Sequence, residues 1–140
     1  MSLRARTAVG AGRAVAAGSK LARMGTGSVI GGRVSLAVHP GLLGELAAGR
    51  EVVLVSAPNG KTTTAALLAA ALRTHGPVVS NALGANMAAG IVAALGGASP
   101  EARAAIEVDE GWLPKVLEAV GPAVVGPGNP TPDPLDPGHE

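Results

Sequence analysis

The sequence contains no cysteine, phenylalanine or tyrosine, and Trp112 is its only aromatic residue. The lack of cysteine excludes both a disulfide framework and a thiolate metal site. Much of the apolar fraction is alanine, which buries little surface per residue, so the predicted hydrophobic core is thin. No apolar run approaches the roughly 20 residues of a membrane-spanning helix. The 140 residues are expected to form one small domain.

Acidic residues are also absent from the N-terminal stretch, because Glu45 is the first acid of the chain. The basic residues before it are Arg4, Arg6, Arg13, Lys20, Arg23 and Arg33. Residues 2–24 are rich in alanine and are predicted to form a basic helix. We favour a helix that packs its apolar side on the domain over a helix that contacts an anionic membrane surface or an organelle transit peptide. The net charge is close to zero, at +1, and no nucleic-acid partner is expected.

Residues 52–64 carry the strongest local pattern of the chain. They begin with Val-Val-Leu-Val, pass through small residues, and enter an alanine- and leucine-rich segment. This order predicts a strand, a loop and a helix, with Gly60, Lys61 and Thr62 at the junction of loop and helix. Backbone N–H groups at a helix start are unpaired and lie at the positive end of the helix dipole. The segment is therefore predicted to hold phosphate groups, with Lys61 adding positive charge and the Thr62 hydroxyl completing the shell of a magnesium ion.

The match to the general phosphate-loop pattern is only partial. That pattern requires a glycine five positions before the glycine that precedes the lysine, and Val55 occupies this position here. An ordinary corner between a strand and a helix remains the alternative. The position of the Gly-Lys-Thr triplet, directly between a buried-type strand and a helix, favours phosphate binding.

The rest of the chain alternates between short strands and helices. The expected elements are two short strands around a Gly-Gly turn in 28–38, a helix in 40–48, a helix in 62–74, a strand at 78–79, a helix in 88–95, a strand in 104–110, a helix in 111–120 and a strand in 122–125. In the helix over 62–74, Leu67, Leu68 and Leu72 are predicted to face the core. The alternation predicts an α/β fold with a parallel sheet of the P-loop type. Prolines interrupt the tail from Gly126 to Glu140, which is predicted to be extended or disordered.

Three loops are predicted to meet at one edge of this sheet, because the carboxyl ends of parallel strands lie together. They are residues 56–62, 80–87 and 107–110. An acidic residue opposite a phosphate loop is suited to binding magnesium, and Glu107 leaves its strand first. Asp109 and Glu110 are weaker candidates, and all three acids could instead simply favour the N-terminal dipole of the next helix.

Residues 53–64, Val-Leu-Val-Ser-Ala-Pro-Asn-Gly-Lys-Thr-Thr-Thr, resemble the ATP loop of Mur ligases, usually written Gly-Thr-Asn-Gly-Lys-Thr-Thr. Two further segments make the resemblance more specific than Mur ligases in general. They are residues 80–91, Ser-Asn-Ala-Leu-Gly-Ala-Asn-Met-Ala-Ala-Gly-Ile, and residues 106–113, Ile-Glu-Val-Asp-Glu-Gly-Trp-Leu. Together with the arginine-rich helix and the Ser-Val-Ile-Gly-Gly segment at 28–32, they are similar to the MurT family, the Mur-ligase-like subunits of lipid II isoglutaminyl synthases. The resemblance extends over residues 2–125.

The resemblance implies an enzyme subunit that uses ATP and Mg²⁺ to activate the α-carboxyl group of D-glutamate in lipid II as an acyl phosphate. Ammonia from a glutamine amidotransferase partner, GatD, would then give D-isoglutamine. The resemblance assigns ATP binding to Asn59, Gly60, Lys61, Thr62 and Thr63, and magnesium binding to Thr62 and Glu107. It assigns no catalytic residue within the chain. It also implies a cytoplasmic bacterial protein that works at the inner face of the membrane.

Two residues depart from the family's loop, since Ala57 replaces its first glycine and Pro58 its threonine. Pro58 has no N–H to donate to a phosphate, so weaker ATP binding is expected. The family's zinc ribbon, adenine-contacting part and C-terminal domain have no counterpart here. We therefore expect the N-terminal part of such a protein, truncated, with a basic helix at 1–27, a partial ATP-binding domain like the central domain of Mur ligases at 28–125, and a proline-rich tail at 126–140. An inactive remnant or nucleotide-binding module, and another Mur-type amino-acid ligase, are the alternatives.

Overall fold

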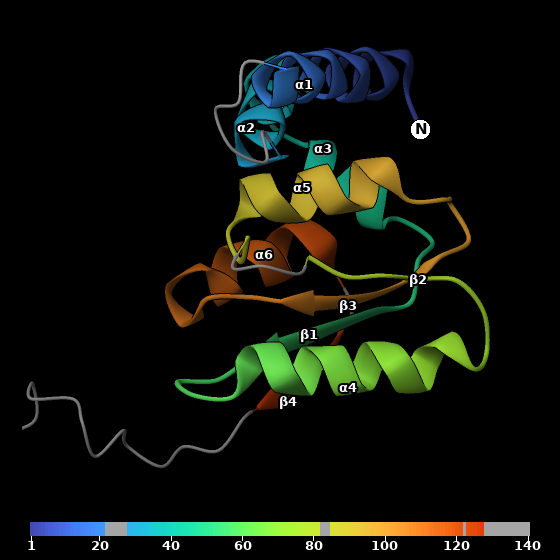
Figure 1. Ribbon diagram of the computed structural model, residues 1–140, viewed down its shortest axis with the longest axis vertical. Coiled ribbons are helices and arrows are strands. Elements are labelled where there is room, and N and C mark those ends of the chain that lie inside the picture. The colour runs from blue at the N-terminus through green and yellow to red at the C-terminus, as the bar shows by residue number, and fades with distance from the viewer. Residues whose placement is uncertain (22–27, 82–84, 122, 128–140) are drawn as a thin grey trace, which may run out of the picture.

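A four-stranded parallel sheet forms the centre of the protein (Figure 1). The computed structural model describes residues 1–21, 28–81, 85–121 and 123–127. The strands are β1 (Val52–Ser56), β2 (Val78–Val79), β3 (Arg103–Glu107) and β4 (Val124–Pro127), in the order β2-β3-β1-β4. All three pairings are parallel, with Val55 opposite Glu107 in the central pair. The predicted α/β fold with a parallel sheet is therefore confirmed.

Helices cover both faces of the sheet (Figure 1). On one face lie α3 (Leu42–Ala47), α5 (Ala88–Gly97) and α6 (Leu113–Val120), the last preceded by a 3₁₀ turn, η1 (Glu110–Trp112). On the other face lies α4 (Lys61–Arg73). Successive side chains of a strand point to opposite faces, so Leu54 and Ile106 enter the larger core with Ile91 and Leu95. The core side of α4 consists of small residues.

One prediction about α4 is wrong. Leu67 is 68% exposed, and Leu68 and Leu72 are only partly buried. The buried residues of the helix are Ala65 and Ala69, which lie one turn apart on one face. The physical reason is that methyl side chains allow α4 to approach the sheet closely, whereas leucine side chains at this contact would hold it away.

The segment 28–38 is also not a pair of strands, because it forms one helix, α2 (Ser28–Val38). Its two adjacent glycines serve helix packing instead of a turn. A Cβ atom on Gly31 would lie 2.5 Å from the carbonyl oxygen of Gly12, and one on Gly32 would lie 1.8 Å from that of Ala89. Backbones this close leave no room for a side chain. Tertiary packing here overrides the strand preference of the neighbouring Val and Ile residues.

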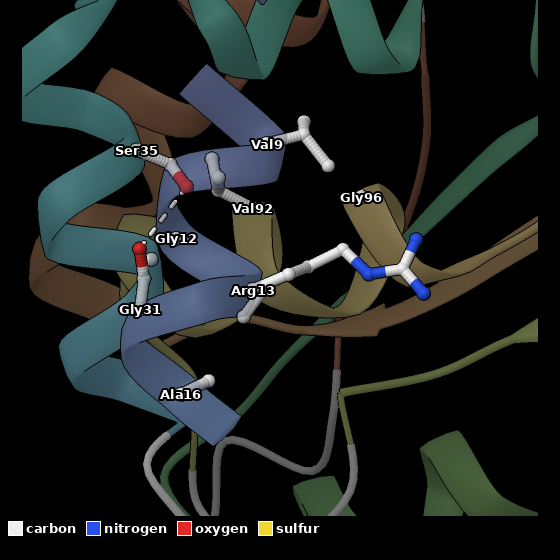
Figure 2. Close-up of a pocket in the computed structure, with 10 residues that line it drawn as sticks. Val9, Gly12, Arg13, Ala16, Gly31, Ser35, Val92 and Gly96 are labelled. Carbon is white, nitrogen blue, oxygen red and sulfur yellow. Dashed lines mark hydrogen bonds between the residues drawn. The ribbon is translucent and has the colours of Figure 1, made fainter. Parts of the chain in front are cut away.

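The N-terminal helix α1 (Leu3–Leu21) lies on α2 and forms a third layer above α5 (Figure 1). It buries Ala5 and Ala8, so the interpretation as a packed helix is confirmed. Figure 2 shows the junction of α1, α2 and α5, where small residues surround a cavity of about 120 Å³ and the Arg13 side chain extends past Gly96. Contact with a membrane surface stays a prediction. Within the described residues, no helix is both long and apolar enough to cross a bilayer.

The first two residues of the predicted tail belong to the sheet. Gly126 and Pro127 belong to β4, where they lie opposite Val55 and Ser56. A proline is compatible with this position because β4 is an edge strand of the sheet. Residues 128–140, which carry the rest of the predicted tail, lie outside the described part of the chain.

Candidate functional site

The carboxyl ends of β1 and β3 open a crevice at the edge of the sheet. These strands are neighbours, yet the chain leaves β1 toward α4 on one face and leaves β3 toward η1 and α6 on the other (Figure 1). The loops therefore diverge at this point. In parallel α/β sheets, such a switch of direction is where ligands bind.

The loop of residues 57–60 joins β1 to α4 and ends in a left-handed glycine. Gly60 has φ of +78°, a conformation that residues with a side chain rarely adopt. The first turn of α4 then begins at Lys61, and the N–H of Thr64 is bonded to the Gly60 carbonyl. The N–H groups before Thr64 have no carbonyl one turn back within the helix. The loop and this first turn line a cavity of about 320 Å³, formed by Pro58, Asn59, Gly60, Lys61, Thr62, Thr63 and Glu107.

Thr62 and Glu107 meet across this cavity. The Thr62 hydroxyl donates a hydrogen bond of 2.9 Å to Oε2 of Glu107. Glu107 is buried, with 5% of its surface exposed. Glu107 reaches α4 because alternation along β3 directs it to that face of the sheet, opposite to Ile106. The structure thus brings together the two residues predicted to bind magnesium.

This pair of oxygen atoms fits an octahedral Mg²⁺ site. Ligands on adjacent corners of an octahedron, each about 2.1 Å from Mg²⁺, lie about 3 Å apart. The observed separation of 2.9 Å matches this value. The described residues contain no group of three or more His, Asp or Glu side chains placed to hold a metal by themselves. Mg²⁺ commonly takes only one or two protein ligands and completes its shell with phosphates and water.

Lys61 lines the same cavity. Its ammonium group donates to the Ala57 carbonyl at 2.5 Å and to the two carboxylate oxygens of Glu110 at 3.1 and 3.4 Å. Burial alone would raise the pKa of Glu110, but the backbone N–H of Glu110 itself and the bond from Lys61 outweigh it and lower the pKa. Glu110 is therefore ionised at neutral pH and forms an ion pair with Lys61.

Asn81 is a site residue for which no role was predicted from the sequence. Its side chain donates to the backbone carbonyls of Glu107 at 2.7 Å and Ala85 at 2.9 Å, and accepts from the Glu107 N–H at 2.8 Å. Asn81 is 4% exposed. Its amide therefore links the segment after β2 to the end of β3 by hydrogen bonds. These bonds fix the backbone of Glu107 and so position its carboxylate. The sequence signals for it were its place in the loop 80–87, which was predicted to reach this edge, and an amide residue just after a short strand.

The remaining acid of the predicted cluster has a structural role. Asp109 accepts a hydrogen bond from the Gly111 N–H and caps η1, as the alternative interpretation of the acids predicted. Of the second predicted loop, residues 82–84 lie outside the described part of the chain. The described residues of that loop approach the end of β3, because the Asn86 carbonyl accepts a bond from the Asp109 N–H. The three loops therefore do converge.

This parallel α/β sheet, with helices on both faces and its loops gathered at one edge, is consistent with the fold of Mur ligases. No protein-family model matches the chain. It is 35% identical over 109 residues to the MurT subunit of the glutamine-hydrolysing lipid II isoglutaminyl synthase of Streptococcus pneumoniae (strain ATCC BAA-255 / R6), covering 74% of this chain and 24% of that subunit. It is 37% identical over 103 residues to the same subunit from Staphylococcus aureus strains COL and N315, covering 71% of this chain and 24% of each relative. The chain is a MurT-like protein, and it spans about a quarter of the length of these relatives.

Proposed function

We propose that the chain provides the phosphate- and magnesium-binding half of the ATP site in a MurT-like subunit of a lipid II isoglutaminyl synthase. The observation that carries this proposal is the contact between Thr62 and Glu107 at the start of α4, beside Lys61. It unites a helix N-terminus, a cation and an oxygen pair with magnesium spacing. The relatives carry the name of this synthase.

Each residue of the site has a role in this proposal. The N–H groups of the loop and first turn, from Asn59 to Thr63, receive the phosphate oxygens, and Lys61 adds a mobile positive charge. Thr62 and Glu107 hold Mg²⁺, which neutralises charge on the transferring phosphoryl group when bound. Gly60 lets the backbone turn into α4 close to the anion. Pro58 supplies no N–H, so fewer donors serve the outer phosphates than in the family's loop.

In the full reaction that we propose, ATP activates the α-carboxyl of D-glutamate in lipid II as an acyl phosphate. Ammonia from a GatD-like amidotransferase subunit then attacks this carbonyl carbon, phosphate leaves, and D-isoglutamine forms. No residue of this chain is assigned to the attack by ammonia. The chain's own contribution is to position phosphate and metal, for which electrostatic preorganisation is the main source of rate enhancement. The reaction belongs in the cytoplasm, where ATP and the D-glutamate of lipid II meet.

Titration of Mg·ATP by isothermal calorimetry tests this proposal. We expect the wild-type chain to bind, and Lys61→Ala to weaken binding by about tenfold or more, because it removes the charge nearest the phosphates. Lys115→Ala is the matched control, since Lys115 makes its contact with Trp112 on α6, 5.0 Å from the ring centroid. Equal affinity of wild type and Lys61→Ala, or no binding by either, would refute the phosphate site.

Turnover separates the proposed synthase subunit from a nucleotide-binding module. Ammonia-dependent release of phosphate is measured with lipid II and a GatD-like partner, using this chain and a full-length relative. The chain covers 24% of the relatives, so we expect turnover by the relative alone. Binding of Mg·ATP without turnover by this chain would assign it the phosphate-binding function and leave the amidation to the longer protein.

A further inference from the structure

The ammonium group of Lys61 is already engaged by two partners in this structure. It carries three N–H bonds, and three oxygen atoms surround it within 3.4 Å. These are the carbonyl of Ala57 and both carboxylate oxygens of Glu110. A phosphate that enters the loop cavity must therefore compete with these acceptors for the ammonium group.

The two partners of Lys61 differ in how easily they can be displaced. The Ala57 carbonyl belongs to the loop backbone, and Ala57 is 3% exposed. The Glu110 side chain is 47% exposed and lies at the first residue of η1, where water can replace its contact with the ammonium. The carboxylate of Glu110 is thus the partner that a phosphate would replace.

The charges around the cavity also indicate that Glu110 opposes the binding of phosphate. Among the described residues that line it, Lys61 is the only cation and Glu107 is an anion. Glu110 adds a second negative charge through its contact with Lys61. A polyphosphate that arrives without a metal ion therefore meets an excess of negative charge, and Glu110 holds the one cation among the described lining residues.

We propose that Glu110 competes with phosphate for the ammonium group of Lys61 and so lowers the affinity of the loop for metal-free polyphosphate. This inference rests on the proposed phosphate site and adds to it a residue that sets its selectivity. Glu110 acts through Lys61 and is a positioning residue. A divalent cation on the phosphate reduces the repulsion and makes the exchange favourable.

The test is the affinity of the chain for tripolyphosphate in the presence of a chelator, measured for wild type and Glu110→Gln. We expect Glu110→Gln to bind about three- to tenfold more tightly, since a charged competitor becomes a neutral one. The gain should shrink at high salt because it is electrostatic. Glu110→Asp keeps the charge and should retain most of the competition, and Glu118→Gln on α6 is the matched control that should leave the affinity unchanged.

A second readout ties the effect to Lys61 itself. Acetylation of Lys61 by acetic anhydride is followed by mass spectrometry at increasing tripolyphosphate concentration. Protection should occur at a lower concentration in Glu110→Gln than in wild type. An affinity of Glu110→Gln equal to or weaker than wild type would overturn the inference. If Lys61→Ala binds tripolyphosphate as well as wild type, or if nothing binds, the phosphate site itself fails.

Discussion

Replacement of Asn81 should destabilise the fold more than any other single change of a polar side chain at the site. The Asn81→Ala variant leaves the N–H and carbonyl of Glu107 and the carbonyl of Ala85 without their partner. Asn81 is 4% exposed, so water replaces these bonds poorly. Three lost bonds at about 0.5–1.5 kcal/mol each give a loss of roughly 2–4 kcal/mol in the free energy of unfolding.

Asn81→Asp should be worse than Asn81→Ala at neutral pH. A carboxylate would face the carbonyl oxygens of Glu107 and Ala85, to which the amide now donates, and negative oxygens would repel one another. Protonation restores one donor, so the stability of this variant should partly recover as the pH falls. The same change should weaken Mg·ATP binding, because the Glu107 backbone loses its fixed position.

Urea unfolding followed by circular dichroism measures these differences. A loss of this size should lower the midpoint by about 1–2 M. Asn86→Ala is the control, since it is in the same loop region and its side chain has no hydrogen bond to another described residue. A free energy for Asn81→Ala within about 0.5 kcal/mol of wild type would refute the reasoning, as would equal losses for Asn81→Ala and Asn86→Ala.

Two glycines at the junction of α1, α2 and α5 should change the unfolding temperature in opposite directions when they are replaced by alanine. A Cβ on Gly12 would meet the Ser35 hydroxyl at 2.0 Å and the Gly31 carbonyl at 2.5 Å, so Gly12→Ala should lose about 2–3 kcal/mol by forcing α1 and α2 apart. A Cβ on Gly96 would meet Val9 at 3.4 Å, so Gly96→Ala should gain about 0.5–1 kcal/mol; a loss there, or no loss for Gly12→Ala, would contradict the described packing. The backbone N–H of Ser2, then His39 and the Ser2 hydroxyl, lower the pKa of Glu45 to about 2. Its contribution to stability is therefore complete above its ordinary pKa of about 4.5 and is lost as the pH falls toward 2. Glu45→Gln should flatten the pH dependence of the unfolding temperature over this interval, and an unchanged profile would rule out the interaction.

The sequence predicts the sheet well because strands and their following helices have distinct local patterns. The apolar runs at 52–55 and 104–107 are clear enough to predict two parallel strands whose following loops lie at one edge. That prediction also brings Thr62 close to Glu107. The same local patterns mislead at 28–38, where Gly31 and Gly32 serve contacts with Gly12 and Ala89 that are distant in sequence.

The ion pair and hydrogen bonds of the site could not be predicted from the sequence for a similar reason. The acidic partner of Lys61 is Glu110, which is distant in the sequence, and only the three-dimensional turn at η1 decides this. The contacts of Asn81 likewise depend on how β2 ends relative to β3. Patterns in the chain identify residue types suited to a function, whereas the pairing of those residues depends on the completed fold.

The sheet order also has a consequence for the time at which the site forms during synthesis. The central strand β1 pairs with β3 and β4, so the ribosome must first produce α4, β2 and α5 before β1 meets its first partner. Pairings between segments this distant in the chain form slowly, because a long loop must close before any contact compensates for it. Thr62 lies just after β1 and Glu107 is the last residue of β3, so the chain between them must close into a loop before their side chains meet. The metal-binding pair is therefore completed only when β3 docks, and a nascent chain that ends before β3 cannot yet present it.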